Sequence, residues 1–305
     1  MLLTSVFVYL ALIYELYEII IMVCSFKPIS RSWVAISELE KPLGVIEFIG
    51  GAALGTFPTI AYHHFLTTIW EHGYTVIAVP YPLGFNHQAI AQYLKDERDI
   101  IRTTLNYDAK IPQIWVAHSL GCKYIALLEI QKDIIDQPSL LIAPNIGSTE
   151  NAIPLRCLAS LLDRLNLGVR PDRDTTLAWI RQAVSANELF HITSLLSFEQ
   201  DCISGNQNGA QNCRRRLFPP LPPSTNDVKW FDNLLQNRPD FFYSFHQIKG
   251  GHNKLAGWRR GQFVKELDNS DGQLIQPIPR EVENSSLEII KSLRDVAQTL
   301  LIDEN

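Results

Sequence analysis

Apolar and polar residues follow two kinds of spacing along this chain, and together they predict a layered α/β fold. Short apolar runs bounded by Gly, Pro or polar residues are typical of buried strands, and longer segments with apolar residues every three to four positions are typical of amphipathic helices. Strands and helices alternate, so we expect a mostly parallel central sheet with helices on both faces. The predicted strands are 31–37, 44–49, 74–79, 113–117, 139–143, 191–198 and 241–248, and the predicted helices are 58–73, 87–105, 124–128, 155–167, 175–187 and 281–302.

One domain, residues 27–305, accounts for this alternation, and two segments interrupt it. Residues 145–190 carry two predicted helices and would lie over the C-terminal edge of the sheet. A helical cap, or lid, would occupy this position, and a packing subdomain without a lid role is the alternative. Residues 204–227 are polar, with three arginines and a proline-rich run, which is typical of a surface loop insertion.

The first 26 residues form a separate hydrophobic segment. Residues 1–14 and 19–24 are almost wholly apolar, and Glu15 and Glu18 lie between them. A bilayer span needs about 20 apolar residues and would here bury two carboxyl groups. The features of a secretory signal, an early positive charge and a small-residue cleavage site, are missing. A membrane anchor, a helix docked on the domain, and an upstream extension before a start at Met22 remain open.

The amino-acid composition limits the classes of partner and cofactor that we expect for this protein. The 305 residues are 46% hydrophobic and 19% charged with a net charge of −5, which indicates a globular domain without the basic surface that nucleic acid requires. The five cysteines have no metal-ligand spacing and predict reduced thiols in a reducing compartment. We therefore expect no metal, no organic cofactor and no nucleic-acid partner, and a cytoplasmic protein with membrane association through residues 1–26 as an open option.

The strongest chemical signal is the segment Ala117-His118-Ser119-Leu120-Gly121 between a predicted strand and a predicted helix. Small residues two positions before and after Ser119 allow strand and helix to approach closely, as in a nucleophile elbow of the Gly-x-Ser-x-Gly type. Ala117 replaces the first glycine and is still small. An ordinary turn with Ser119 as helix N-cap is the alternative.

Two later strand ends supply an acid and a base. Asp201 follows strand 191–198, and His252 follows strand 241–248 after two glycines. Ser, Asp and His occur in the order that α/β hydrolases use, and chemistry in open α/β sheets lies at the carboxyl ends of strands. We therefore predict Ser119 as nucleophile, His252 as base and Asp201 as the acid that orients it. Glu199, Asp227, Asp232 and Asp240 remain alternatives for the acid, and His63, His64, His72, His118 and His246 are interpreted as packed or solvated, with His118 directed to the other side of the strand end.

Backbone N–H groups of Gly51 or Ala52, after strand 44–49, and of Leu120 are the predicted oxyanion donors. Apolar residues in the neighbouring loops favour an acyl or lipid-like substrate. The predicted substrate-binding residues are Leu54, Phe57, Leu83, Phe85 and His87.

The segments 45–55 and 73–81 and the elbow 117–121 together resemble the domain-of-unknown-function 1350 family, which occurs in cyanobacteria and plant plastids and is similar to α/β hydrolases. The resemblance covers roughly Ser30 to Lys265 in order and spacing. It implies the α/β-hydrolase fold, an esterase- or lipase-like activity and, in a plant, a location in the plastid stroma. The chain departs from general hydrolases at Ile49, where a His often precedes the glycine.

Two functional hypotheses follow. The first is a serine hydrolase that cleaves a carboxylic ester or thioester through an acyl-enzyme. The second is a non-catalytic α/β-hydrolase-fold protein used for binding or as a scaffold. Acyl transfer in place of hydrolysis is compatible with the same residues.

Overall fold

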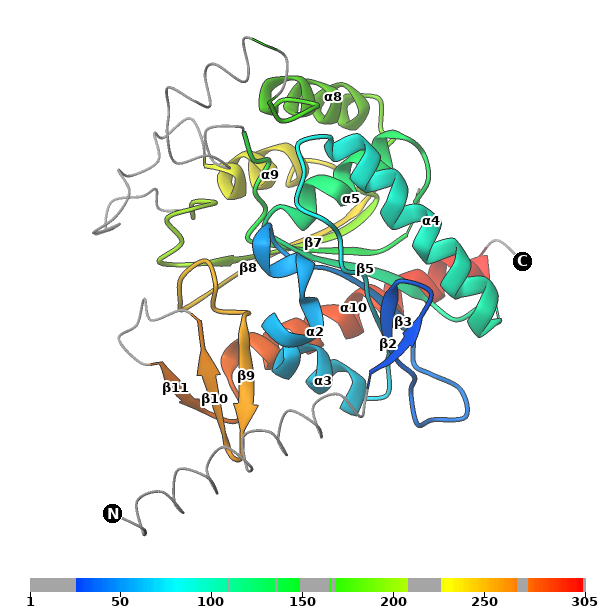
Figure 1. Ribbon diagram of the computed structural model, residues 1–305. Helices are drawn as coiled ribbons and strands as arrows, with labels where there is room; N and C mark the ends of the chain where they lie inside the picture. Colours follow the sequence, from blue (N-terminus) through cyan, green and yellow to red (C-terminus); the bar gives the residue numbers. More distant parts are fainter. Residues whose placement is uncertain are drawn as a thin grey trace, which may run out of the picture.

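A central sheet organises the computed structural model, which describes residues 26–108, 110–134, 137–148, 165, 168–207, 226–267 and 274–303 (Figure 1). Its eight strands lie in the order β1-β2-β4-β3-β5-β6-β7-β8. The β1 and β2 strands pair antiparallel, β2 pairs antiparallel with β4, and all other neighbours are parallel, which confirms the predicted mostly parallel sheet. The strands are β1 Lys27–Ile29, β2 Ser32–Ala35, β3 Val45–Ile49, β4 Thr75–Ala78, β5 Gln113–His118, β6 Ser139–Ile142, β7 Ile192–Phe198 and β8 Phe242–Ile248.

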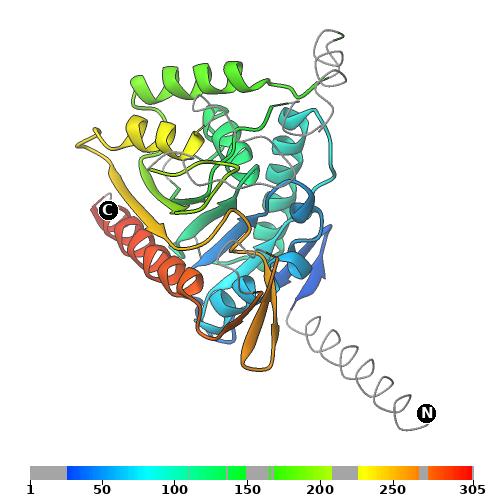
Figure 2. The same cartoon turned by 90° about the vertical axis from the view of Figure 1, so that its left-hand side faces the viewer.

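Helices cover both faces of this sheet, as the two views in Figures 1 and 2 show. One face carries α4, α5, α8 and α9, and the opposite face carries α3 and α10. The helix bounds are α2 Pro58–Ala61, α3 His63–Glu71, α4 His87–Leu105, α5 Gly121–Ile130, α8 Arg173–Ser185, α9 Asp227–Leu235 and α10 Glu281–Asp303, with a short 3-10 helix η1 at Ala53–Thr56. The single helix predicted for 58–73 is divided at Tyr62, because the backbone there leaves the helical region (φ −115°, ψ 24°).

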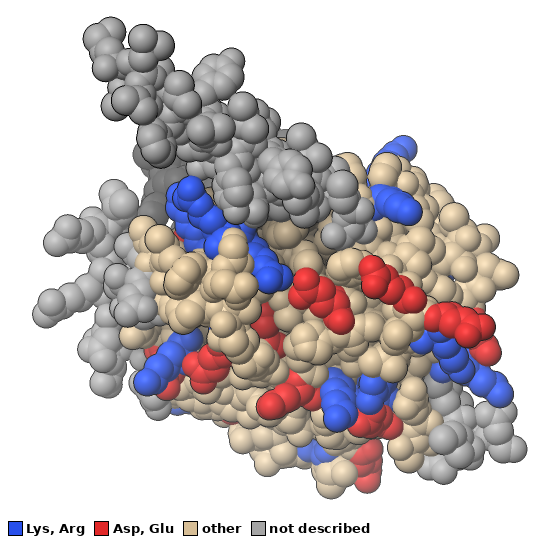
Figure 3. Space-filling view, turned by 90° about the horizontal axis from the view of Figure 1, so that it is seen from below, with Lys and Arg blue, Asp and Glu red and all other residues tan. Residues whose placement is uncertain are grey.

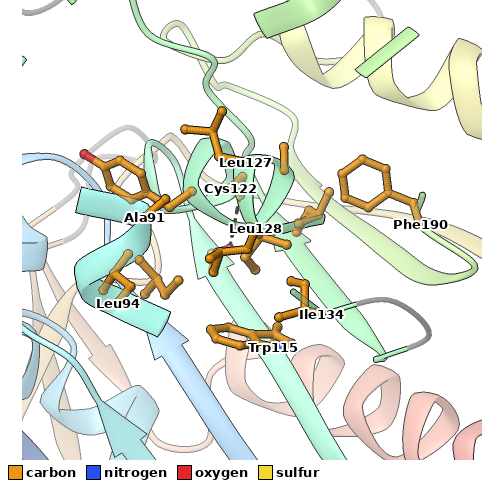
Figure 4. Packing of buried hydrophobic residues seen from close by; sticks show 14 of the residues in the cluster. Ala91, Leu94, Trp115, Cys122, Leu127, Leu128, Ile134 and Phe190 are labelled. Atoms are coloured by element: carbon orange, nitrogen blue, oxygen red, sulfur yellow. Dashed lines mark hydrogen bonds between the residues drawn. The ribbon is translucent and has the colours of Figure 1, made fainter. Parts of the chain in front are cut away.

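The helix that follows the elbow is embedded in the core. Residues 121–129 of α5 are all buried, and Figure 4 shows Cys122, Leu127 and Leu128 packed above Trp115 of β5. Side chains of α4 lie on one side of them and Phe190 lies on the other. Close packing on all sides of α5 leaves little room for movement, so the start of the helix is held in place beside Ser119.

A second sheet, which the hydrophobic pattern did not predict, follows β8. It has the order β11-β10-β9, with β9 Gly257–Arg260, β10 Phe263–Glu266 and β11 Ile275–Pro277. Its buried side carries an ion network: the Glu266 carboxylate accepts from Lys254 Nζ and from Arg280 Nη1, each at 3.0 Å. Arg280 also pairs with Glu283 at the start of α10. Every charge in the network has an opposite partner, as buried charges require, and the network ties the β8–β9 loop to α10.

Parts of the two predicted insertions lie outside the described residues. Of the predicted cap, the helix at 155–167 is not described, whereas α8 forms and is capped by the Asp172 carboxylate, which accepts from Thr175 N–H at 2.7 Å. Of the polar insertion, residues 208–225 are not described, and its last residue, Asp227, is the buried first residue of α9. A lid role for residues 145–190 stays a prediction.

The hydrophobic segment 1–25 lies outside the described residues. In the part of the chain that the structure describes, no helix combines the length and apolar character that a bilayer crossing demands. The prediction of reduced thiols is wrong for Cys202, which is disulfide-bonded, whereas Cys122 is free and buried. On the face seen from below, acidic and basic side chains lie among neutral ones, so this face carries charges of both signs (Figure 3).

Candidate active site

Ser119 occupies a strained turn between β5 and α5. Its φ is 55°, a left-handed conformation that a non-glycine residue adopts at an energetic cost. A Cβ on Gly121 would lie 2.4 Å from the carbonyl oxygen of Ile49, so position 121 can hold no side chain while strand and helix keep this approach. Ala117 is fully buried in β5, and its methyl group is accommodated. The local geometry is therefore that of the predicted elbow, despite the missing first glycine.

The three predicted triad residues form one continuous hydrogen-bonded chain. Ser119 Oγ lies 2.7 Å from His252 Nε2, and His252 Nδ1 lies 2.9 Å from Asp201 Oδ2. Residues 201 and 252 come from the loops after β7 and β8, and parallel strands bring those loops to the same edge as the elbow. All three side chains are buried, with Asp201 fully enclosed and Ser119 7% exposed.

The second oxygen of Asp201 is fixed by the backbone. Asp201 Oδ1 accepts from Ile203 N–H at 2.7 Å and from Ser204 N–H at 2.9 Å. The carboxylate therefore presents Oδ2 to His252 Nδ1, which must donate. In the neutral imidazole this leaves the lone pair on Nε2, and that lone pair faces the Ser119 hydroxyl. These hydrogen bonds thus direct the Nε2 side of the His252 ring towards Ser119.

The other candidate acids and histidines lie elsewhere. Asp227 pairs with Arg173 and accepts from Ile146 N–H, and Asp232 accepts from Tyr243 Oη at 2.8 Å. Of the carboxylates considered from the sequence, only Asp201 contacts His252 among the described residues. The two other candidate acids, Glu199 and Asp240, are exposed.

The loop after β3 passes directly against the elbow. A Cβ on Gly51 would lie 2.9 Å from Ser119 Cβ, so glycine permits this approach. The N–H of Gly51 is already donated to Tyr62 Oη at 2.8 Å. The N–H groups of Ala52 and Leu120 have no acceptor among the described residues. Of the three predicted oxyanion donors, Ala52 and Leu120 therefore keep an available N–H, and Gly51 does not.

The predicted substrate-binding residues differ in their exposure to solvent. Phe57, Leu83 and Phe85 are 63%, 66% and 38% exposed, on loops after β3 and β4 that Tyr81 joins by hydrogen bonds to the carbonyl oxygens of Gly50 and Gly55. Leu54 is half-buried against the core on the α3 face. His87 is buried, packs edge-to-face on Tyr124, and has a pKa lowered by desolvation to about 3. His87 is therefore a neutral packing residue and does not present a charge to the loops.

Two polar residues beside the elbow have positions that the sequence did not reveal. Lys123, in the first turn of α5, is buried and donates to the carbonyl oxygens of Gly147 and Pro171 at 3.3 and 2.8 Å. Burial lowers the pKa of Lys123 to about 7. His118, interpreted from the sequence as pointing away, lies with its ring centroid 5.0 Å from that of His252. For both Lys123 and His118, the only indication in the sequence was a polar residue within an otherwise apolar strand–helix motif.

Several solved structures share the architecture of this protein. A monoacylglycerol lipase of Paleococcus ferrophilus superimposes with a TM-score of 0.51 at 13% identity, covering 86% of this chain and 98% of that one. The fluorophosphonate-binding serine hydrolase FphF of Staphylococcus aureus superimposes with a TM-score of 0.50 at 14% identity, covering 72% and 85%. The fold is the α/β-hydrolase fold, as predicted.

The sequence also places the chain in a family. Residues 25–208 match the family described as "Protein of unknown function (DUF1350)", so the chain belongs to that family, and the resemblance seen in the sequence is confirmed. No curated protein sequence matches the chain significantly.

Proposed function

We propose that this protein is a serine hydrolase that cleaves a carboxylic ester or thioester. The observation that carries the proposal is the chain of contacts from Ser119 Oγ through His252 to Asp201, at 2.7 and 2.9 Å. A serine hydroxyl is a weak nucleophile until a base in contact removes its proton, and this arrangement supplies the base. The strained backbone at Ser119 supports the same role, since strain of this kind collects at functional residues.

In the proposed mechanism, Ser119 Oγ attacks the substrate carbonyl carbon while His252 Nε2 takes the hydroxyl proton. The resulting oxyanion accepts from the N–H groups of Ala52 and Leu120. His252 then returns the proton to the leaving alcohol or thiol as the carbon–oxygen or carbon–sulfur bond breaks, which leaves an acyl-serine. Water, deprotonated by His252, attacks the acyl group and releases the carboxylic acid and the free serine. Asp201 stays ionised and stabilises the imidazolium in both steps.

An acyl or lipid-like group is the proposed substrate moiety. Phe57, Leu83 and Phe85 expose apolar side chains on the loops beside the proposed oxyanion donors. Burying such side chains against an acyl chain is favourable at about 25 cal/mol per Å² of apolar surface. The similar fold of a monoacylglycerol lipase is compatible with this substrate class.

Labelling with a fluorophosphonate probe tests the catalytic proposal. The folded wild type is expected to take up the probe, and Ser119→Ala is expected to take up none. Ser194→Ala is the matched control, because Ser194 is also a buried serine hydroxyl but pairs with Ser244 at 2.7 Å and not with His252. A folded wild type that resists the probe would favour the non-catalytic hypothesis.

A series of p-nitrophenyl esters of increasing acyl length tests the substrate class. We expect kcat/KM to rise from acetate towards medium-chain esters and to fall for the longer acyl chains when Phe57 is replaced by Ser. Equal kcat/KM for all chain lengths would contradict an acyl-binding role for the exposed apolar side chains.

A further inference from the structure

A line of buried hydrogen bonds joins the two loops that flank Ser119. Gly51 N–H donates to Tyr62 Oη at 2.8 Å, Tyr62 Oη lies 2.9 Å from His118 Nδ1, and His118 Nε2 lies 2.8 Å from the carbonyl oxygen of His252. Gly51 belongs to the loop that carries the proposed oxyanion donor Ala52. His252 is the proposed base. Tyr62 and His118 therefore bridge the two loops on which the proposed chemistry depends.

The chemistry of the groups fixes the direction of every hydrogen bond in this line. A carbonyl oxygen only accepts, so His118 Nε2 must carry a proton and donate to His252. The neutral ring then has its lone pair on Nδ1 and accepts the proton of the Tyr62 hydroxyl. Tyr62 Oη in turn accepts from Gly51 N–H. The line is complete, with one donor and one acceptor at each contact.

Burial keeps His118 in this neutral form. Tyr62 is fully buried and His118 is 1% exposed. Desolvation, with a smaller contribution from His252, lowers the pKa of His118 to about 3. A protonated ring would carry a proton on Nδ1 and would oppose the Tyr62 hydroxyl proton. The bridge is therefore intact at any pH at which an ester hydrolase is assayed near neutrality.

Packing alone does not require these polar groups. An apolar ring and an aliphatic side chain could fill the same volume, and each polar atom buried there needs a hydrogen-bond partner to avoid a desolvation penalty. The polar side-chain atoms of Tyr62 and His118 all form hydrogen bonds, either with the backbone of the flanking loops or with each other. This arrangement is suited to fixing a distance between loops.

We propose that Tyr62 and His118 are positioning residues that set the separation of the Gly51–Ala52 backbone and His252 around Ser119. The proposal rests on the proposed hydrolase function. Neither residue touches the reacting atoms. Together they hold the His252 backbone while Asp201 orients its ring, and they hold the peptide that precedes the Ala52 N–H. A displacement of about 1 Å in such a site can lower a rate about a hundredfold.

Tyr62→Phe is the first test, because it removes only the hydroxyl. Tyr243→Phe is the matched control: its hydroxyl donates to Asp232 at 2.8 Å, between β8 and α9, without contact to either loop. We expect kcat for a p-nitrophenyl ester to fall about tenfold in Tyr62→Phe with KM within about threefold of wild type, since positioning acts on the transition state. Tyr243→Phe should leave both constants unchanged. An unchanged kcat in folded Tyr62→Phe would overturn the proposal.

Two substitutions of His118 provide the rescue test. His118→Gln can still place an amide N–H near the position of Nε2 and donate to the His252 carbonyl, whereas His118→Leu cannot. We expect kcat to fall about a hundredfold in His118→Leu and about tenfold in His118→Gln, on the scale of removing one catalytic hydrogen bond. Equal loss in both variants, at equal thermal stability, would show that His118 only fills space.

Failure of this inference is distinguishable from failure of the proposed function. If the wild type neither hydrolyses esters nor takes up the fluorophosphonate, the hydrolase proposal fails first. If the wild type is active and labelled, while Tyr62→Phe and His118→Leu keep wild-type kcat, only the positioning role fails.

Discussion

Asp201→Asn is the substitution whose effect follows most directly from the geometry. The two backbone donors, Ile203 N–H and Ser204 N–H, both point at Oδ1. An asparagine must keep its carbonyl oxygen there to accept from them, so its NH₂ group takes the place of Oδ2. That group donates to His252 Nδ1, which becomes an acceptor. The proton of the neutral imidazole then moves to Nε2, where it faces Ser119, and the base is lost.

The expected loss of kcat in Asp201→Asn is large, because the backbone hydrogen bonds to position 201 enforce the wrong tautomer of His252. In a serine protease triad the same exchange lowers kcat about ten-thousandfold, which corresponds to about 5 kcal/mol of barrier. The two donor distances of 2.7 and 2.9 Å are ordinary good hydrogen bonds, so a flipped amide would place NH₂ against two N–H groups. Leaving those donors unpaired costs about 1–3 kcal/mol each, which opposes the flip that would restore activity.

The assay is steady-state hydrolysis of a p-nitrophenyl ester by wild type, Asp201→Asn and Asp232→Asn. Asp232 is the matched control, because it is a buried aspartate that accepts from Tyr243 and Gln207 and has no contact with His252. Asp232→Asn should retain kcat within about threefold, as expected for a residue that makes no transition-state contact. If the two variants lose activity equally, the reasoning about the tautomer is refuted.

Three further predictions follow from buried groups. Gly121→Ala should destabilise the fold by about 1–3 kcal/mol in urea unfolding, because a Cβ would meet a backbone carbonyl at 2.4 Å. Gly84→Ala should not, because a Cβ there would make only an ordinary van der Waals contact with Ile90 at 3.6 Å. Glu266→Gln should lower the free energy of unfolding by about 3–5 kcal/mol, since Lys254 and Arg280 would share too few negative partners; an unchanged value would mean that the network is not buried in solution. His87→Phe should make the free energy of unfolding less sensitive to acid. In the wild type the folded-state pKa of His87, about 3, lies below its ordinary value of 6.5, so the unfolded chain binds the proton first. The wild type should therefore lose stability below pH 6.5, by up to about 2 kcal/mol at pH 5. Equal stability losses of wild type and His87→Phe between pH 7 and 5 would contradict the lowered pKa.

Much of the central sheet could be predicted because its strands are local apolar runs. All seven strands that the pattern predicted occur within a few residues of their expected bounds, and helix 87–105 has the expected ends. Its C-terminus is set by Asn106, whose left-handed φ of 47° ends the helix. The β9–β11 sheet was missed because its strands are short and their polar residues, such as Glu266, are buried in ion pairs.

The sequence by itself determined the order of the chemical groups and the strand ends on which they lie, because strand ends and small-residue turns are local properties. Only the tertiary structure decided which carboxylate meets His252 and which loop N–H groups are already used. Ser119 and His252 are 133 residues apart and Asp201 and His252 are 51 apart, so no local pattern records their distances. No local pattern records the contacts of Gly51 and His118 either. Tyr62 Oη accepts from Gly51 N–H and donates to His118 Nδ1, so Gly51 N–H is not available as an oxyanion donor and His118 lies in the hydrogen-bonded bridge.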